Sequence, residues 1–469
     1  MSEKQPIAAL LAETTIIILA AGKGKRMLSD KPKAHNIIGN KTLLDHVLDT
    51  SFRLKAKHVI VVVPLNSTEI FKKACKVQHP TWVEQEQPLG TAHAVASTLG
   101  EVKTSHCLIL NADTPLIKED ILLKLIHKTQ KSLGIITAIH PNPHGYGRII
   151  RGKNLEISEI VEERDCNDIL KEITEINAGI GYFPKDFLQE HWHKIQNNNQ
   201  QKEYYLTDYI KLWNQQHRVA SYTTHNIEHI TGINNKLDLI RLERLWQKKH
   251  AEELIEKGVH IHDPCRFDCQ GDLHAQSGVT IDINVIIRGK VTIGKNSHIG
   301  AHCILENVAI GNNTTIQPYS YIRNTTIGSA AHFGPFSYAR NKTTIGNHTK
   351  IGCFVETKET RLDDYTKASH LTYLGNLNVG KHVNIGAGFI HCNYNGVNKY
   401  SSTIDDHAFI GANTQIVGPC HIGAFATIAA GSTITKNAPA EQLTIARSKQ
   451  VSLSNWQRPE KKDILNCIK

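Results

Sequence analysis

The sequence lacks any apolar run of the roughly 20 residues that a membrane-spanning helix needs. The apolar stretch from Ile7 to Ala21 is interrupted by Glu13, and no clean cleavage site follows it. We therefore expect no signal peptide and interpret Thr15–Leu19 as a buried first strand that runs into a turn. These absences disfavour a membrane or secreted protein, and we expect a cytoplasmic one.

The cysteines indicate neither a disulfide-stabilised protein nor a structural zinc protein. The 10 cysteines are scattered and form no disulfide framework. One pair, Cys265 and Cys269, has the spacing of metal ligands but lacks the second pair that a structural zinc site needs. Such usage is typical of a protein from a reducing compartment.

The positive charge comes without the features of a nucleic-acid-binding protein. The net charge is +10, yet no basic helix, zinc finger or aromatic RNA-binding platform accompanies it. We expect no nucleic-acid partner, because nucleotides, sugar phosphates and coenzyme A are anions that suit the same charge. With 40% hydrophobic and 21% charged residues among 469, the chain is typical of a globular protein of about two to four domains.

The clearest positive signal is a repeat in the C-terminal half, where an aliphatic residue followed by glycine returns about every six residues. The pairs are Ile293-Gly294, Ile299-Gly300, Ile310-Gly311, Ile327-Gly328, Ile345-Gly346, Ile351-Gly352, Val379-Gly380, Ile385-Gly386, Ile410-Gly411 and Ile422-Gly423. In a parallel β-helix three short strands make one triangular turn, so every sixth residue points inward and glycine relieves the crowded corner. A β-sandwich would instead alternate with a period of two. The repeat predicts a left-handed parallel β-helix.

The N-terminal half alternates apolar runs with helical stretches. Strands are expected at TIIILAA, HVIVVVP, CLILNAD and GIITAI, and helices at TLLDHVLDTSF and EDILLKLIHKT. This order predicts a Rossmann-like α/β domain with a mostly parallel sheet over residues 1–234. Residues 235–258 have helical periodicity, dense charge and no proline, and predict a linker helix. The β-helix and a polar tail fill residues 259–469, with the coil ending near Ser432.

The loop LAAGKGKRM carries the first sign of chemistry. Gly22 and Gly24 allow the backbone to approach a phosphate, and Lys23, Lys25 and Arg26 supply positive charge where a pyrophosphate would leave. The loop is neither a Walker loop nor a dinucleotide-binding GxGxxG. On its own, a merely structural turn remains an alternative.

Further motifs follow this loop in order. They are Pro32-Lys33, QEQPLGTAHA from Gln85, LILNADTPLI from Leu108, GYGR from Gly145, IVEERD from Ile160, EINAGI from Glu175 and GINN from Gly232. With them, the first half resembles the nucleotidyltransferases that join a nucleoside triphosphate to a sugar 1-phosphate. Together with the hexapeptide half, nearly the whole chain resembles a family of bifunctional uridyltransferase/acetyltransferase enzymes of bacterial cell-wall precursor synthesis.

The resemblance implies two reactions. Members of this family acetylate glucosamine 1-phosphate with acetyl-CoA, and then transfer uridylyl from UTP to N-acetylglucosamine 1-phosphate with Mg²⁺, releasing pyrophosphate. It also implies that three copies of the chain form a homotrimer. The nucleotide sugar that the enzyme makes would serve peptidoglycan and lipopolysaccharide synthesis, and thereby cell shape.

The same resemblance gives roles to residues of the first domain. Arg26 and Lys33 would brace the triphosphate, and Asp113 and Asn234 would ligate Mg²⁺, an ion that prefers oxygen ligands. The residues that would hold N-acetylglucosamine are Gly147, Glu162 and Asn177. The residues that would hold uridine and the remainder of the sugar nucleotide are Leu19, Ala20, Ala21, Gly22, Lys33, Gln85, Gly90, Thr91, Asn111 and Ala112.

For the second domain the resemblance points to a catalytic histidine. An ammonium group has no lone pair and must lose a proton before it attacks a thioester, and histidine suits this task. His370 matches the catalytic base of the family, with Glu356 as a candidate to orient its imidazole. Arg340, Lys358, Tyr373 and Asn384 would bind the sugar phosphate. Contacts with acetyl-CoA would come from Ala387, Asn393, Tyr394, Ala412, Ala430 and Arg447.

Some positions depart from the usual residues of the family. Lys25, His35, Asn111, Ala112 and Ala178 do so near the expected phosphate and sugar contacts, which is compatible with a less efficient uridylyl step.

Two other functions would explain parts of this sequence. A sugar-1-phosphate nucleotidyltransferase with a regulatory, non-catalytic β-helix would give no reason for His370 to stand amid Arg340 and Lys358. A non-catalytic trimeric scaffold would not need to retain all four of the residues Arg26, Lys33, Asp113 and Asn234.

Overall fold

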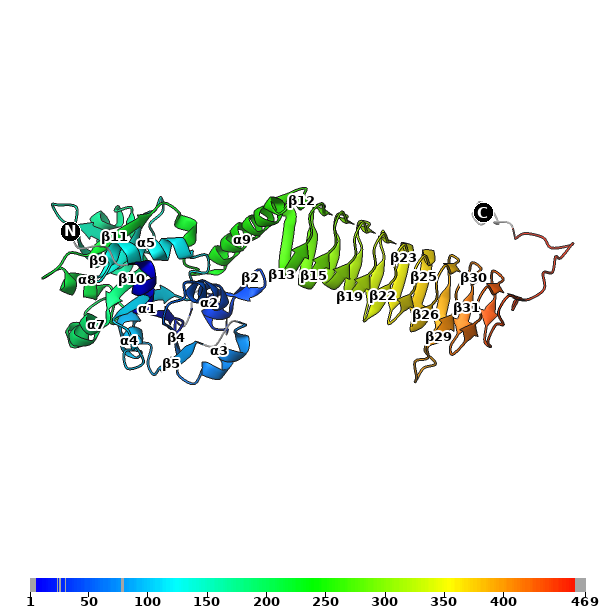
Figure 1. Cartoon of the computed structure of the whole chain (residues 1–469), viewed down its shortest axis with the longest axis horizontal. Coiled ribbons are helices and arrows are strands. Elements are labelled where there is room, and N and C mark those ends of the chain that lie inside the picture. The colour runs from blue at the N-terminus through cyan, green and yellow to red at the C-terminus, as the bar shows by residue number, and fades with distance from the viewer. Residues whose placement is uncertain (1–5, 23, 25–26, 30, 77–79, 460–469) are drawn as a thin grey trace, which may run out of the picture. The chain divides into compact units, whose positions relative to one another are not determined.

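The computed structural model describes residues 6–22, 24, 27–29, 31–76 and 80–459. The chain divides into two compact units, Met1–Glu252 and Glu253–Lys469 (Figure 1). Over these described ranges, no helix has both the length and the apolar character needed to cross a membrane.

A twisted sheet forms the centre of the first unit. Within the described residues it has nine strands, in the order β11-β7-β10-β6-β1-β4-β5, with β8 paired to β10 and β9 paired to β8. The strands are β1 (Thr14–Leu19), β4 (His58–Pro64), β5 (Thr81–Gln85), β6 (His106–Asn111), β7 (Gly134–Ile139), β8 (Arg148–Arg151), β9 (Ile157–Val161), β10 (Glu175–Pro184) and β11 (Ala220–Thr224), beside a small hairpin of β2 (Ile37–Ile38) and β3 (Lys41–Thr42). The predicted α/β fold is confirmed. The antiparallel pairs involve β8, β9 and β10.

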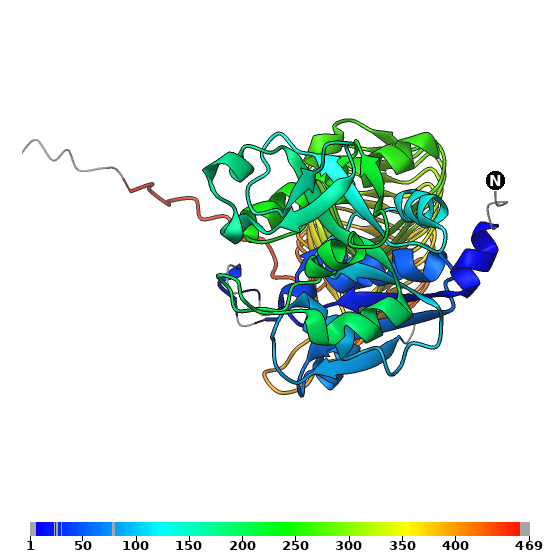
Figure 2. The same ribbon diagram turned by 90° about the vertical axis from the view of Figure 1, so that its left-hand side faces the viewer.

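Helices cover both faces of this sheet (Figures 1 and 2). On one face lie α1 (Ile7–Ala12), α2 (Leu43–Arg53), α3 (Thr68–Ala74) and α5 (Glu119–Thr129), and on the other α4 (Thr91–Ala96), α7 (Lys185–His191) and α8 (Asp208–Trp213). Strand β1 shows the consequence, since Ile16 and Ile18 enter one core and Ile17 the other. A strand that is buried on both sides reads as a continuous apolar run, which is why TIIIL was recognisable in the sequence.

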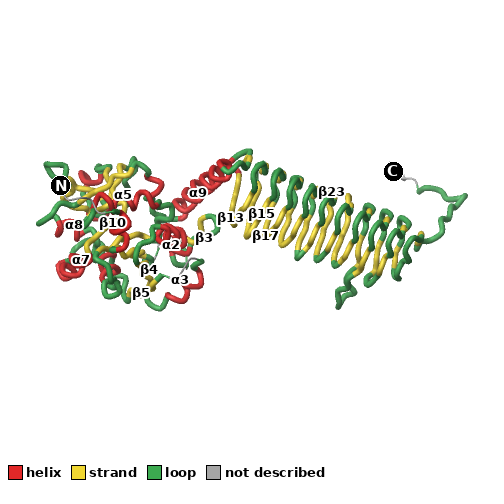
Figure 3. The backbone as a smooth tube through the Cα atoms, viewed as in Figure 1, coloured by secondary structure: helices red, strands yellow, loops and turns green. Residues whose placement is uncertain are grey.

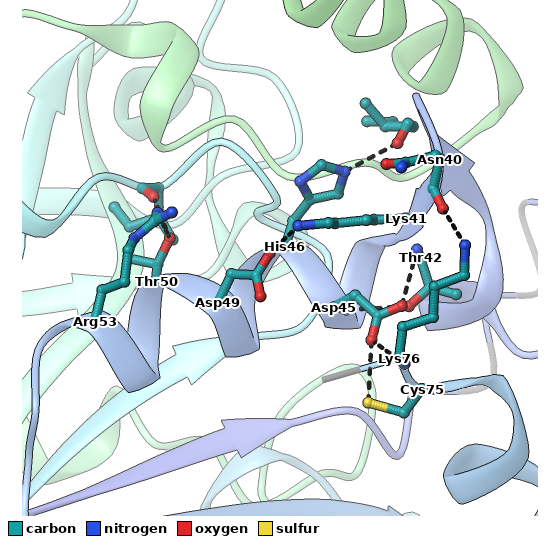
Figure 4. Close-up of polar contacts among 12 residues, drawn as sticks. Asn40, Lys41, Thr42, Asp45, His46, Asp49, Thr50, Arg53, Cys75 and Lys76 are labelled. Carbon is teal, nitrogen blue, oxygen red and sulfur yellow. Dashed lines mark hydrogen bonds and ion pairs between the residues drawn. The ribbon is translucent and has the colours of Figure 1, made fainter. Parts of the chain in front are cut away.

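The start of α2 is held by a buried carboxylate. Thr42 Oγ1 accepts a hydrogen bond from Asp45 N at 3.0 Å, and Asp45 Oδ2 accepts one from Thr42 N at 3.3 Å, which makes a capping box. Asp45 Oδ1 accepts from Cys75 Sγ and from Lys76 N, at 3.1 and 2.9 Å (Figure 4). These bonds tie α2 to the chain that follows α3 and satisfy a carboxylate with no solvent exposure.

The long helix α9 (Lys236–Glu256) begins at a second capping box. Asp238 N donates to Asn235 Oδ1, and Asp238 Oδ2 accepts from the backbone N–H groups of Asn234 and Asn235. Further along, the Trp246 ring lies against Gly39, where a Cβ atom would stand 2.4 Å from the ring and where φ is +60°. The capping box holds the segment around Asn234 in place, and the Trp246 contact ties α9 to the turn between β2 and β3.

The second unit is a parallel sheet of hexapeptide repeats, as in a left-handed β-helix, and this confirms the predicted fold (Figure 3). Its strands are β12 (His260–Ile261), β13 (Phe267–Ala275), β14 (Thr280–Ile281), β15 (Val285–Ile293), β16 (His298–Ile299), β17 (Ile304–Ile310), β18 (Thr315–Ile316), β19 (Tyr321–Ile327), β20 (His332–Phe333), β21 (Tyr338–Arg340), β22 (Thr343–Ile345), β23 (Lys350–Lys358), β24 (Arg361–Leu362), β25 (Lys367–Gly375), β26 (Leu377–Val379), β27 (Asn384–Ile385), β28 (Ile390–Cys392), β29 (Ser402–Ile404), β30 (Phe409–Ile410), β31 (Gln415–Val417), β32 (His421–Ile422), β33 (Thr427–Ile428), β34 (Thr433–Ile434) and β35 (Leu443–Thr444).

The spacing of register partners explains the repeat. Ile281, Ile299 and Ile316 pair on successive coils 18 and 17 residues apart, so one coil takes about three hexapeptides. All three side chains are fully buried. A glycine follows the inward-pointing aliphatic residue because the backbone of the next coil lies too close for a Cβ atom. At Gly294, for example, a Cβ atom would stand 2.6 Å from the backbone of Gly311.

Two features of the coil could not be found from the repeat. The coil does not end near Ser432 as predicted, because β34 and β35 follow, and Ala429 N donates to Thr444 O at 3.0 Å. In addition, the coil between β28 and β29 carries an inserted hairpin over residues 393–400, closed by a bridge between Tyr394 and Lys399. Because of this hairpin, Lys381 N reaches Asp406 across 25 residues rather than 17 or 18.

Candidate active sites

A cavity of about 230 Å³ opens in the first unit where β1 and β6 end. Leu19 and Asn111 close these two strands and are register partners, which brings their following loops to one edge of the sheet. Eight residues with predicted roles line the cavity: Leu19, Thr91, Asn111, Asp113, Gly147, Glu162, Asn177 and Asn234.

A cluster of oxygen ligands and one ammonium stands at this cavity. Lys33 Nζ forms an ion pair with Asp113 Oδ2 and donates to Asn234 Oδ1 at 3.3 Å. Ile233 N donates to Asp113 O at 2.9 Å, which holds Asn234 beside the carboxylate. A carboxylate and an amide oxygen that converge on one cation form a donor set suited to Mg²⁺.

The opposite wall of the cavity is built for hydrogen bonding. Asn177 N donates to Gly147 O at 2.8 Å, and Asn177 Oδ1 accepts from Gly179 N at 3.1 Å. Thr207 Oγ1 donates to Glu162 Oε1 at 3.1 Å, while burial raises the pKa of Glu162. Thr207 lines the same cavity and was missed in the sequence. In the sequence, the one feature that marks Thr207 is its place directly before the short helix α8.

Other predicted residues of this unit do not line the cavity: Ala20, Ala21, Gly22, Lys33, Gln85, Gly90 and Ala112. Lys33 reaches it through the contacts above. Gln85 Nε2 lies 3.3 Å from Gly90 O and 2.9 Å from His93 Nδ1, so these residues form their own cluster at the start of α4. Arg26, Lys23 and Lys25 lie outside the described residues.

The second unit gathers three cationic side chains. Register places Arg340 of β21 beside Lys358 of β23. The ammonium of Lys399, from the 393–400 hairpin, lies next to Lys358 and lowers the pKa of Lys358, because two like charges disfavour each other. Such a cluster suits an anion with several oxygens, such as a phosphate. Lys399 was missed because it lies three residues beyond the recognisable NYNG sequence.

The expected contact between Glu356 and His370 is not formed. Glu356 Oε1 accepts from Arg340 Nε and Nη2, at 3.0 and 2.5 Å. The imidazole of His370 is exposed and makes no hydrogen bond to the residues that the structure describes. The register explains this difference, since Glu356 pairs with Tyr373 whereas His370 pairs with Cys353. Glu356 therefore orients Arg340.

A column of small side chains starts beside His370. Gly388 N donates to His370 O at 3.3 Å, and the preceding Ala387 is stacked with Ala412 and Ala430 on the next coils, two residues after the register partners Ile385, Ile410 and Ile428. Arg447 Nη1 donates to Ala430 O at 2.6 Å at the far end.

The other predicted residues of this unit lie nearby along the chain. Asn384 opens β27, where it pairs with Lys367 of β25. Asn393 Nδ2 donates to Asn376 Oδ1 at 2.7 Å, and Tyr394 is exposed on the hairpin. Tyr373 lies on β25 three residues after His370.

Comparisons with known proteins cover both units. Residues 16–195 match the MobA-like NTP transferase domain, residues 269–362 the GMPPB C-terminal domain, and residues 401–436 the bacterial transferase hexapeptide (six repeats). The chain is similar to the "Bifunctional protein GlmU" of Francisella philomiragia, with 44% identity over 95% of this chain and 99% of the relative. The proteins of the same name from Legionella pneumophila and from Francisella tularensis subsp. novicida are 43% and 46% identical, each over 96% of this chain and 99% of their own.

Proposed function

The chain belongs to the family of bifunctional GlmU proteins, and from this premise we propose that its two units catalyse consecutive steps toward UDP-N-acetylglucosamine. The protein is an enzyme with a nucleotidyltransferase unit and a hexapeptide acyltransferase unit. The second unit acetylates glucosamine 1-phosphate with acetyl-CoA. The first unit then transfers uridylyl from UTP to N-acetylglucosamine 1-phosphate and releases pyrophosphate.

In the acetyl step the cationic cluster holds the substrate. Arg340, Lys358 and Lys399 bind the phosphate of glucosamine 1-phosphate, while Glu356 keeps the guanidinium of Arg340 in place. His370 accepts the proton of the amine as the nitrogen lone pair attacks the thioester carbonyl. The C–S bond then breaks, and coenzyme A leaves as a thiolate that takes up this proton to become the thiol. The column of Ala387, Ala412 and Ala430 leaves a flat strip along which coenzyme A lies.

In the uridylyl step the protein positions charges. A phosphate oxygen of the sugar phosphate attacks the α-phosphorus of UTP, and pyrophosphate leaves from the opposite side. Asp113 and Asn234 are the residues that would hold Mg²⁺, which when bound neutralises the phosphate charge. Lys33 moves from Asp113 toward the triphosphate, and Glu162, Asn177 and Gly147 orient the sugar. Arg26 is assigned to the same triphosphate.

The observation that carries this proposal is the cationic cluster of Arg340 on β21, Lys358 on β23 and Lys399 on the hairpin, since β23 pairs directly with β25, the strand that carries His370. A regulatory β-helix, the alternative function, gives no reason for these charges to converge beside an exposed histidine. Both reactions use cytoplasmic metabolites, and we place the protein in the cytoplasm, where its product supplies peptidoglycan and lipopolysaccharide synthesis.

One assay tests the proposed function. The purified protein is incubated with glucosamine 1-phosphate, UTP and Mg²⁺, with and without acetyl-CoA, and nucleotide sugars are separated by chromatography. We expect UDP-N-acetylglucosamine only when acetyl-CoA is present, and without acetyl-CoA only when N-acetylglucosamine 1-phosphate replaces glucosamine 1-phosphate. Failure to release coenzyme A thiol in the complete mixture would contradict the acetyl step and favour the alternative function.

We further propose that the active form is a homotrimer. Two observations support it: His370 is exposed on the coil, and the tail exposes Val451, Leu453 and Trp456. A hexapeptide coil also has flat faces against which further copies can pack. Light scattering of the intact protein is expected to give about three times the mass of one chain. A fully active monomer at assay concentration would contradict this assembly.

A further inference from the structure

A histidine occupies the interior of the β-helix next to the inserted hairpin. His391 lies on β28 and is 1% exposed. Its register partner on the next coil is Ile416, and the partner of Ile416 is Ile434. The coil therefore has an imidazole where the following two coils have isoleucine. A buried imidazole has two polar nitrogens, and both need a hydrogen-bond partner.

Both nitrogens of His391 are satisfied within the coil. Nδ1 lies 2.5 Å from Gly375 O, and Nε2 lies 2.7 Å from Ser402 Oγ. A carbonyl oxygen can only accept, so Nδ1 carries the hydrogen and Nε2 accepts from the Ser402 hydroxyl. Ser402 Oγ in turn accepts from Cys420 N at 3.0 Å. The bonds form one chain with a fixed direction, from Cys420 through Ser402 and His391 to Gly375.

The ring is held in its neutral form. Burial lowers the pKa of His391, and the bond to Gly375 O opposes this effect. Among the described residues, the hydroxyl of Ser402 packs against the His391 ring. Gly418 leaves room for the ring, since a Cβ atom at Gly418 would stand 2.9 Å from His391 Nε2. One donor and one acceptor in fixed positions make His391 a rigid spacer.

One end of this series of hydrogen bonds reaches β25, the strand that carries residues of the acetyl site. Gly375 closes β25, on which His370 and Tyr373 lie, and its register partner is Lys358. The Tyr373 ring packs against Gly375 so closely that a Cβ atom at Gly375 would stand 2.4 Å from the phenol oxygen. A shift of Gly375 would therefore move Tyr373 and Lys358.

The other end reaches the hairpin. Ser402 begins β29, two residues after the hairpin that carries Tyr394 and Lys399, and Ser402 N donates to Asn376 O at 3.2 Å. At the hairpin's other base, Asn393 donates to Asn376 Oδ1 at 2.7 Å. Hydrogen bonds through His391 thus link β25 to the strand that follows the hairpin.

We propose that His391 is a positioning residue for acetyl transfer, whose two ring nitrogens hold the hairpin lysine, Lys399, at the distance from Lys358 and Tyr373 that the sugar phosphate requires. This inference rests on the proposed acetyl transfer to glucosamine 1-phosphate. It predicts an effect on substrate binding, because what would move is the phosphate cluster and not the imidazole of His370.

The test compares His391→Val, His391→Asn and Ser402→Ala in the full-length protein. For His391→Val we expect kcat/KM of acetyl transfer to fall about 10–100-fold, mostly through a higher KM for glucosamine 1-phosphate, since a misplacement of about 1 Å has effects of this size. Ser402→Ala should shift KM in the same direction but less. His391→Asn can still donate to Gly375 O and should recover part of the loss.

Ser297→Ala is the matched control. Ser297 is also 1% exposed inside the coil, and its hydroxyl makes the same kind of link, donating to Gly311 O at 2.8 Å and accepting from Thr314 N at 3.0 Å. It lies in earlier coils, before β21. We expect an unchanged KM for Ser297→Ala, and unchanged uridylyl transfer in all four variants.

The outcomes separate this inference from the function on which it rests. A wild-type protein without acetyl transfer would overturn both. An active wild type with unchanged KM in His391→Val, or an equal rise in KM for Ser297→Ala, would overturn the positioning role alone. If His391→Val does not fold, Ser402→Ala decides the question, because it removes one oxygen and leaves the ring in place.

Discussion

His370→Ala is expected to lower the turnover of acetyl transfer by about 10²–10⁴-fold, the usual effect of removing a general base, and to leave uridylyl transfer unchanged. The remaining rate should rise with pH, because more of the glucosamine amine is then already deprotonated. The measurement is release of the coenzyme A thiol, followed across pH at saturating substrates. His421→Ala, which replaces an exposed histidine bonded to Asp405 at 2.7 Å, serves as the matched control.

Glu356→Gln distinguishes the two roles considered for that carboxylate. Because Glu356 accepts two hydrogen bonds from Arg340, we expect its loss to raise the KM for glucosamine 1-phosphate about tenfold, with little change in kcat. If Glu356 instead oriented His370, kcat would fall and its pH profile would shift.

For the His370→Ala variant, near-normal acetylation would mean that another group removes the proton from the amine.

Asp113→Ala should lower uridylyl transfer by about 10²-fold or more, because the variant loses a charged ligand of the expected Mg²⁺ and removes the carboxylate with which Lys33 forms an ion pair. Acetyl transfer should remain, since its residues belong to the second unit. The measurement is pyrophosphate release from UTP and N-acetylglucosamine 1-phosphate. Asp113→Asn retains the shape but not the charge, and should also be impaired.

The control for this prediction is Asp120→Ala, which removes an exposed carboxylate paired with Lys124 on α5 of the same unit. It should be nearly neutral in both reactions. Addition of a chelator to the wild type should likewise stop uridylyl transfer and spare acetyl transfer. Equal loss of both activities in a folded Asp113→Ala protein would contradict the assignment of the two reactions to separate units.

Both folds could be predicted from short-range patterns. The apolar run from Thr15 to Leu19 signals a strand buried on both faces, because helices cover each side of the sheet. The aliphatic-glycine pairs signal the coil, because every sixth residue points inward and the next coil leaves no room for a Cβ atom, as at Gly294. Each of these signals is a short pattern in the sequence, although the contacts that cause it are made with more distant segments.

The contacts of the candidate sites depend on distant segments and could not be predicted in this way. Lys33 meets Asp113 and Asn234 across 80 and 201 residues, where the sheet edge and the cap of α9 converge. In the coil, register decides which side chains meet. Glu356 faces Arg340 rather than His370, and the inserted hairpin brings Lys399 to Lys358.

The division has a simple physical basis. The sequence by itself determined the two folds, their order along the chain and the residue types of both sites, because periodic burial and tight turns leave local patterns. Only the tertiary structure decided which of those residues touch. Coil length and strand register set these pairings, and a one-residue change in either would give Glu356 or His391 a different partner without altering the local pattern.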